Sequence, residues 1–255
     1  MMKIENHTGQ FLRGLPFFSN LPEADLEVLI KAAQIRDYNR QQGIFIRGDK
    51  AERFFIIING WIKLHRETME GEESVVALFT RGDVLGEAAI LGGADYPFSA
   101  EAAEKSRVAE IPAAALKEVA QNNPDILRRV MASMSREMRR LQLETEHRAM
   151  MDAPQRISCM LLQLSADMIG AGGAFTFPYD KSLAAARLGM KPETFSRALA
   201  QLKSDGVTVK GSEIRIDSFS HLAELSCSHC SCAAGECKVP CGFPQGRDVA
   251  CSGKE

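Results

Sequence analysis

Residues 179–216 read YDKSLAAARLGMKPETFSRALAQLKSDGVTVKGSEIRI, and this stretch decides the fold of the C-terminal part of the chain. The segment from Lys181 to Leu188 is rich in alanine and leucine, which favours a short helix. Gly189 follows where a turn is needed, because a residue without a Cβ accepts backbone angles that other residues resist. Pro192 then opens a second helix to Ser204, since a proline at the first helical position loses no hydrogen bond. Two short helices around a glycine turn predict a helix-turn-helix.

The second of these helices has two different faces. Its apolar residues recur at helical spacing and predict a buried side: Phe195, Leu199 and Leu202. Four residues on the N-terminal, outward part are candidates for contacting DNA: Lys191, Glu193, Ser196 and Arg197. A carboxylate can accept from the amino group of cytosine and a guanidinium can donate twice to guanine, so these residue types suit reading of the major groove. The alternative is an ordinary helical hairpin whose charged face is solvated.

A small β-wing is predicted directly after the second helix. Gly206 ends that helix, and VTVKGSEIRI then gives two short strands around Gly211 and Ser212. The whole stretch therefore predicts a winged helix-turn-helix.

Composition places limits on the class of protein. A chain of 255 residues is long enough for two domains with their own cores. A net charge of −2 argues against a protein that coats nucleic acid indiscriminately, but a sequence-specific regulator needs only local positive charge. No apolar run approaches the length of a membrane span, and the N-terminal MMKIENHTGQ lacks the apolar core of a secretory signal. We therefore expect a cytoplasmic protein without a membrane partner.

The N-terminal half carries many short β runs. From Ile35 to Ile111 these runs recur about every ten residues between turns, as in IFI (44–46), FFIIING (54–60), WIKLHRE (61–67) and SVVALF (74–79). Such spacing predicts a closed β-roll or barrel rather than alternating strands and helices. A barrel of this size can hold one small ligand or fill itself with side chains.

A long helix is predicted from Pro124 to about Met151. Within it, five apolar residues alternate spacings of four and three: Leu127, Met131, Met134, Met138 and Leu141. This is a heptad seam, which favours a homodimer; the alternative is a single amphipathic helix against its own barrel. A further helix, Gln155 to Met168, and a loop, GAGGAF, precede the helix-turn-helix.

The predicted organisation has four segments in an α+β chain. They are a sensory β-roll domain at 11–121, a dimerisation helix at 122–153, a winged helix-turn-helix domain at 154–225 and a cysteine-rich tail at 226–255.

The tail contains six of the seven cysteines. Its densest part reads CSHCSCAAGECKVPC (227–241), and the candidate metal ligands are Cys227, Cys230, Cys232, Cys237 and Cys241. Without an export signal, this density indicates metal or redox chemistry rather than a disulfide framework. The thiolates could hold an iron–sulfur cluster or a zinc ion, or form a reactive tail without metal. Zinc is the less suited metal because six cysteines exceed its needs.

The order of β-roll, heptad helix and winged helix-turn-helix resembles the CRP/FNR superfamily of bacterial transcription regulators. GDVLGEAAILGG (82–93) is similar to that family's roll cassette, and KPETFSRALAQL (191–202) to its recognition helix. The resemblance implies a homodimer that binds double-stranded DNA and works with RNA polymerase. It also implies that Glu193, Ser196 and Arg197 read a TTGAT-like half-site, repeated as an inverted palindrome.

The roll departs from the family's cyclic-nucleotide binders. These use a Gly-Glu pair and, about ten residues later, an arginine followed by a small hydroxyl residue. Gly86 and Glu87 are present as candidate effector-binding residues, but Pro97 and Phe98 stand near the positions of the later pair. No arginine occurs between positions 84 and 103, so the cassette lacks the counter-charge that a buried phosphate needs. Cyclic AMP is therefore not the expected effector.

The expected signal is a gas or a change in redox state. The phrase YPFSAEA resembles the nitric-oxide-responsive, DNR-like branch, whose members are associated with haem; Glu87 is then a structural carboxylate. FNR itself holds an iron–sulfur cluster mainly with N-terminal cysteines, whereas the first cysteine here is Cys159. No histidine has the pattern of an axial haem ligand, the five being His7, His65, His147, His221 and His229.

Two readings from other classes remain. One is an enzyme on a cupin-like barrel, which is disfavoured because the roll lacks the paired histidines and carboxylate of a metal active site. The other is a redox or metal-binding protein that uses the tail, with the helix-turn-helix as a protein-contact module.

Overall fold

The computed structural model describes residues 6–19, 21–67, 73–165, 174–177 and 180–227. The chain divides into two compact units, residues 1–136 and 137–255, with the boundary inside helix α5 (Asp125–Met150).

The first unit contains the predicted β-roll as two four-stranded sheets. Their strand orders are β1-β8-β3-β6 and β2-β7-β4-β5, and each pair of neighbours is antiparallel. The strands are β1 (Gln34–Tyr38), β2 (Gly43–Phe45), β3 (Arg53–Asn59), β4 (Trp61–Glu67), β5 (Glu73–Thr80), β6 (Val84–Leu85), β7 (Ser99–Ala102) and β8 (Ser106–Pro112).

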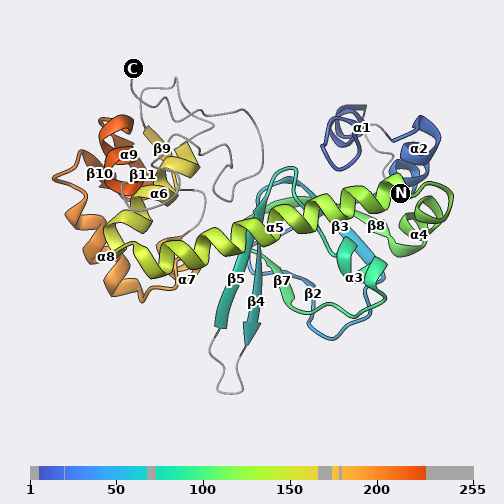
Figure 1. Ribbon diagram of the computed structural model, residues 1–255, viewed down its shortest axis with the longest axis horizontal. Helices are drawn as coiled ribbons and strands as arrows, with labels where there is room; N and C mark the ends of the chain where they lie inside the picture. The colour runs from blue at the N-terminus through green and yellow to red at the C-terminus, as the bar shows by residue number, and fades with distance from the viewer. Residues whose placement is uncertain (1–5, 20, 68–72, 166–173, 178–179, 228–255) are drawn as a thin grey trace. The chain divides into compact units, whose positions relative to one another are not determined.

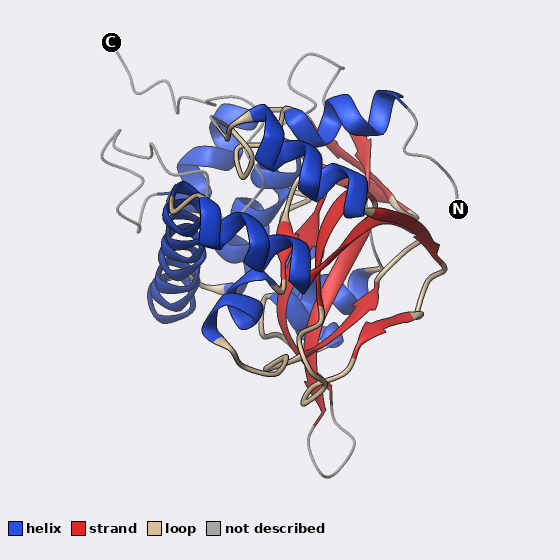
Figure 2. Cartoon of the chain, turned by 90° about the vertical axis from the view of Figure 1, so that its right-hand side faces the viewer, coloured by secondary structure: helices blue, strands red, loops and turns tan. Residues whose placement is uncertain are grey.

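Strand β3 separates two hydrophobic cores, because successive side chains of a strand point to opposite faces. Phe55 and Ile57 belong to a core formed by residues of both sheets, whose strands are among the red arrows of Figure 2. Phe54 and Ile56 point the other way, into a core shared with the helices. The uninterrupted apolar run of β3 follows from this double burial.

Helices cover the outer side of the β3 sheet. The helices α1 (Asn6–Arg13), α2 (Glu23–Ala32) and α4 (Ala113–Asn122) contribute buried residues to the core around Phe54 and lie near one another in Figure 1. The short α3 (Glu87–Gly92) follows β6. Neither α1 nor α3 was predicted, because both are short: α1 has eight residues, and α3 has six after the N-cap glycine Gly86.

A buried carboxylate ties three strands of the first unit together. Glu110 of β8 is 3% exposed and accepts a hydrogen bond from the Tyr38 hydroxyl at 2.6 Å. Arg53 Nη1 donates to its other oxygen at 3.0 Å, and Arg36 Nε lies 3.4 Å from the first. Burial, and then the hydrogen bond to Glu110, raise the pKa of Tyr38 to about 12. The carboxylate is stable here because its charge is matched and its oxygens are hydrogen-bonded.

The long helix α5 leaves its predicted seam exposed. The five heptad residues have exposed fractions between 40% and 66%: Leu127, Met131, Met134, Met138 and Leu141. An apolar stripe of this length on a helix is unusual on a monomer's surface and is typical of a contact surface. The helix ends at Met150, one residue before the predicted limit.

The second unit is a helical domain with a three-stranded sheet. Its elements are α6 (Ala153–Ser165), β9 (Ala174–Thr176), α7 (Lys181–Arg187), α8 (Pro192–Gln201), β10 (Val207–Lys210), β11 (Glu213–Ile216) and α9 (Phe219–Cys227). The predicted α+β class, with β-roll, long helix and winged helix-turn-helix, is confirmed.

Three local expectations in this unit were wrong. Residues 174–176 form strand β9 against β11, although Ala174 and Phe175 were predicted as the end of a loop. Helix α8 ends at Gln201 instead of Ser204, and hydrogen-bonded turns continue to Gly206. Helix α9 was not predicted; it ends at Cys227, and Ser226 within it is fully buried.

Candidate DNA-binding surface and effector site

Helix α7 is fixed at both ends by local hydrogen bonds. The Asp180 side chain caps its N-terminus, accepting from the Leu183 amide at 2.8 Å. After its C-terminus, Gly189 adopts a φ of +63°, which favours glycine, and the Met190 amide returns to the Ala185 carbonyl at 2.9 Å. The capping aspartate was not singled out from the sequence, although its position before an alanine-rich run is a standard signal. The local sequence, through Asp180 and Gly189, therefore determines the turn that orients α8.

Helix α8 separates its two faces as predicted. Phe195 and Leu199 are buried at 0% and 6% exposure, and Leu202, just after the helix, at 1%. Lys191 is the N-cap and Pro192 occupies the first turn. The four candidate DNA-contacting residues are all exposed: Lys191, Glu193, Ser196 and Arg197. Because the apolar face of α8 is packed in the core, its polar face is held in a fixed orientation toward solvent.

The wing is a regular two-stranded hairpin. Strands β10 and β11 pair from Val207–Ile216 to Lys210–Glu213, and Gly211 lies between them with a φ of +63°. Ile214 and Ile216 are buried, whereas Lys210 and Arg215 are exposed. The hairpin therefore holds the positively charged side chains of Lys210 and Arg215 in solvent on a hydrogen-bonded backbone.

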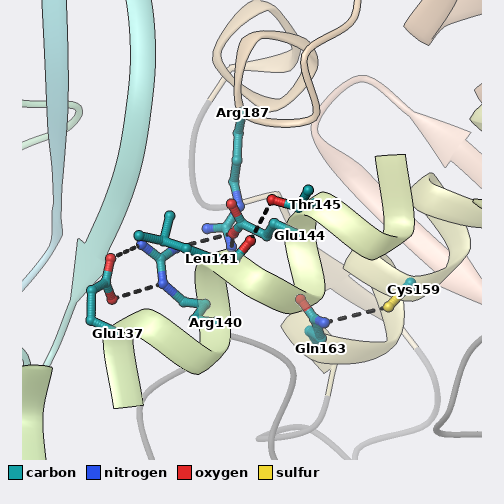
Figure 3. Close-up of polar contacts among 8 residues, drawn as sticks. All are labelled: Glu137, Arg140, Leu141, Glu144, Thr145, Cys159, Gln163 and Arg187. Atoms are coloured by element: carbon teal, nitrogen blue, oxygen red, sulfur yellow. Dashed lines mark hydrogen bonds and ion pairs between the residues drawn. The ribbon is translucent and has the colours of Figure 1, made fainter. Parts of the chain in front are cut away.

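An ionic network joins the C-terminal half of α5 to α7 (Figure 3). Arg140 donates from Nε to Glu137 at 2.9 Å and from Nη1 to Glu144 Oε1 at 3.1 Å. Arg187, the last residue of α7, also donates to Glu144 Oε1, at 3.3 Å. Arg140 and Arg187 are buried at 9% and 8% exposure. The sequence analysis did not identify this network, because charged side chains on a helix carry no periodic sign of which ones are buried.

The candidate effector site lies where β6 meets α3 in the first unit. Gly86 is the N-cap of α3 with a φ of +92°, and Glu87 is 5% exposed. A Cβ added to Gly86 would lie 3.3 Å from Cε1 of Tyr96 and 3.2 Å from the Arg53 carbonyl oxygen. The chain therefore needs glycine here to admit the tyrosine ring and the neighbouring strand.

Tyr96 fills part of the roll interior. It is 5% exposed, and its ring stacks on Phe45 with centroids 3.9 Å apart and an interplanar angle of 18°. Phe45 in turn stacks on Phe55 at 5.3 Å. The Tyr96 hydroxyl donates to the Arg53 carbonyl and accepts from the Arg53 amide at 3.3 Å, and burial raises its pKa. The contact between the Tyr96 ring and Gly86 joins residues ten positions apart and has no signal in the local sequence.

The predicted metal centre lies mostly outside the described residues. Cys227 ends α9, and Cys230, Cys232, Cys237 and Cys241 fall beyond it. Within the described part of the chain, no group of three potential metal ligands comes together. No helix there is long and apolar enough to cross a membrane.

Three of the five histidines have described side chains. His65 is 7% exposed with Nδ1 3.4 Å from Glu73, and His147 is 9% exposed on α5. His221 is exposed, with its imidazole 3.4 Å from Asp205. These surroundings do not single out an axial ligand for haem.

A β-roll, a long helix and a winged helix-turn-helix with an exposed polar recognition face define a DNA-binding transcription regulator. Two family models match the chain: the cyclic nucleotide-binding domain over residues 35–123 and the Crp-like helix-turn-helix domain over residues 155–225. The chain belongs to the CRP/FNR family of transcription regulators. The matched domains and relatives are regulators and not enzymes, so the cupin-like reading is set aside.

The relatives include two kinds of regulator. The fumarate and nitrate reduction regulatory protein of Vibrio cholerae is 30% identical over 217 residues, 83% of this chain and 86% of its own. A CRP-like cAMP-activated global transcriptional regulator of Mycobacterium tuberculosis is 26% identical over 81% of this chain and 94% of its own. The structure of a candidate cAMP-binding regulatory protein from Silicibacter pomeroyi is 35% identical, with a TM-score of 0.63, covering 86% of this chain and 97% of that one.

Proposed function

We propose that this regulator acts as a homodimer that reads an inverted repeat of TTGAT-like half-sites. Glu193, Ser196 and Arg197 would meet base edges in the major groove, and Lys191 would meet the phosphate backbone. The observation that carries this assignment is the division of α8 into a buried apolar face and an exposed polar face that contains all three reading residues. Contact with RNA polymerase, in the cytoplasm, is part of the same proposal.

The proposal of a homodimer is based on helix α5. The exposed stripe of five apolar residues offers a surface to the same stripe of a second copy, and pairing would remove it from water. Two recognition helices then face successive major grooves, which is why the site should be a palindrome.

A gel-shift titration tests the DNA proposal. Full-length protein is titrated against a duplex with two TTGAT-like half-sites in inverted repeat, at one fixed salt concentration. The control duplex has the same composition with both half-sites scrambled. We expect binding to the palindrome at least 10³-fold tighter than to the control. Equal affinity for the two duplexes would contradict sequence-specific reading by α8 and would favour the protein-contact alternative.

We further propose that the signal is a gas or a redox change and not cyclic AMP. The support is that Tyr96 packs against Gly86 and stacks on Phe45 inside the roll, so a nucleotide would have to displace a buried aromatic stack. The cassette also lacks the arginine that would neutralise a cyclic phosphate. The likeness to a fumarate and nitrate reduction regulatory protein supports a gas or redox signal. The likeness to a cAMP-activated regulator supports the competing signal, cyclic AMP.

The cofactor is proposed from the cysteines of the tail. An iron–sulfur cluster suits their number better than zinc, and haem remains the competing cofactor for a gas sensor. Absorption spectra with iron, sulfide and zinc analysis of protein purified without oxygen decide among these. A protein truncated after residue 227 is the matched control, because an earlier cut would remove the buried Ser226 of α9. Equal metal content in both proteins would exclude the tail as the metal site.

A further inference from the structure

A small recess in the second unit has a strongly basic lining. It has a volume of about 50 Å³ and is lined by residues of α5, α6 and the end of α7. Its charged lining consists of four arginines and one glutamate: Arg140, Arg148, Arg156, Arg187 and Glu144. Guanidinium groups stay protonated at any physiological pH, so this is a fixed excess of positive charge.

The nearby acids do not balance that charge. Glu144 is already shared between Arg140 and Arg187, and Glu137 pairs with Arg140. No acid lies within 4.0 Å of Arg148 or Arg156 in the part of the chain that the structure describes. Two guanidinium groups of the lining therefore face the recess region without an acidic neighbour at ion-pair distance.

Arg156 of α6 is the more constrained of these two. Its Nη1 donates to the Leu188 carbonyl at 3.1 Å, which fixes the side chain beside the end of α7. Its Nε is buried without a hydrogen-bond acceptor among the described residues. Burial first, and then the charge of Arg148, lower the pKa of Arg156, against a smaller opposite effect of the Asp152 carboxylate. A buried donor without an acceptor, next to a like charge, is a costly arrangement that an anion would relieve.

We propose that this recess is a binding site for a small oxyanion, such as inorganic phosphate or sulfate, held by Arg148 and Arg156. The planar guanidinium donates two parallel hydrogen bonds to such an anion, which a lysine could not match. A bound water needs about 10–15 Å³, so a recess of about 50 Å³ has room for one small anion.

The site has a structural consequence for the helix-turn-helix. Arg187 ends α7, Arg156 contacts the carbonyl of Leu188 next to it, and Arg148 lies against Gly189 in the turn before α8. An anion between these arginines would connect the turn to α5 and α6. This goes beyond the proposed reading of DNA and does not depend on which sequence α8 recognises.

Thermal unfolding of the full-length protein without DNA tests the site. Sodium phosphate and sodium sulfate are compared with sodium chloride at pH 7 and equal ionic strength. At an oxyanion concentration about ten times the dissociation constant, we expect the Tm to rise by about 2–5 °C over that in chloride.

Three variants separate binding at the site from general salt effects. Arg156→Gln should abolish the rise in Tm and, in chloride, should unfold no earlier than the parent, because the variant removes a repulsion. Arg148→Gln, at an exposed residue, should at least halve the rise. Arg139→Gln replaces an exposed arginine of α5 outside the recess lining and should keep the full rise. The proposal is wrong if Arg156→Gln and Arg148→Gln respond to phosphate as strongly as Arg139→Gln, or if the parent does not respond.

Discussion

The ring of Tyr96 stacks on the ring of Phe45, with centroids 3.9 Å apart, and its edge packs against Gly86. Gly86 belongs to the Gly-Glu pair that cyclic-nucleotide binders of the family use. In this chain the same glycine admits a tyrosine side chain instead. A sequence position that resembles a ligand contact thus serves the core of the roll.

Removing this ring should destabilise the first unit. We expect Tyr96→Ala to lower the free energy of unfolding by about 3–5 kcal/mol, because it deletes a buried aromatic side chain and leaves a cavity. Tyr96→Phe keeps the ring and loses the hydrogen bonds to Arg53, so its cost should be about 1 kcal/mol. Urea denaturation measures both. Equal losses for the two variants would mean that the hydroxyl, and not the ring, holds this part of the roll.

Cyclic AMP should not stabilise the parent protein. The stacked rings stand in the roll interior, and the cassette has no arginine for the phosphate. We expect a change in Tm below about 1 °C at millimolar cyclic AMP, against several degrees for a ligand present at a hundred times its dissociation constant. A saturable rise would place a nucleotide site in this roll in spite of Tyr96.

Tyr38 should give the protein an alkaline limit of stability. Its pKa in the folded state is about 12, whereas an unfolded tyrosine ionises near pH 10. The folded state binds this proton more tightly, so the stabilisation is complete below about pH 10 and is lost as the pH rises toward 12. Tyr38→Phe should flatten the decline in the free energy of unfolding across this window. The decline should not vanish, because burial also raises the pKa of Tyr96.

Much of the fold follows from local patterns. Helix α5 and strand β4 were placed within a residue of their observed limits, because heptad spacing and a short β run after a turn glycine are strong local signals. The face of α8 followed from the spacing of Phe195, Leu199 and Leu202. Strand β9 could not be predicted, since a three-residue strand is defined by its pairing with β11.

The candidate sites were harder to predict than the fold. Glu144 and Arg187 are 43 positions apart, and nothing local shows that they will meet. Both arginines of the network, Arg140 and Arg187, are buried, and nothing in the local sequence indicates this. The same holds for Tyr96 and Phe45, which lie on separate segments of the roll. Long-range contacts of single side chains depend on the packed structure and have no periodic signature.

Arg197 should carry much of the sequence preference of α8. Arg197→Ala should weaken binding to the TTGAT-like palindrome by about 1–3 kcal/mol while leaving binding to the scrambled duplex nearly unchanged. The residue is exposed, so the variant should keep the far-ultraviolet circular dichroism and Tm of the parent. Arg139→Ala removes an equal charge from α5 and serves as the control. Parallel losses on both duplexes would make Arg197 a phosphate contact instead of a base contact.

The exposed stripe of α5 should decide the oligomeric state. Met134 and Met138 are 53% and 63% exposed, and a lysine at either position would put two like charges at the seam of a dimer. We expect Met134→Lys or Met138→Lys to raise the dissociation constant of the dimer at least tenfold, about 1.4 kcal/mol, as measured by sedimentation equilibrium. Affinity for the palindrome should fall in parallel, because two linked half-sites are bound together. Met150→Lys changes a methionine of the same helix that is 58% exposed but lies outside the heptad positions, and it should dimerise like the parent. If Met150→Lys weakens the dimer and Met138→Lys does not, the contact between copies lies on another face of α5.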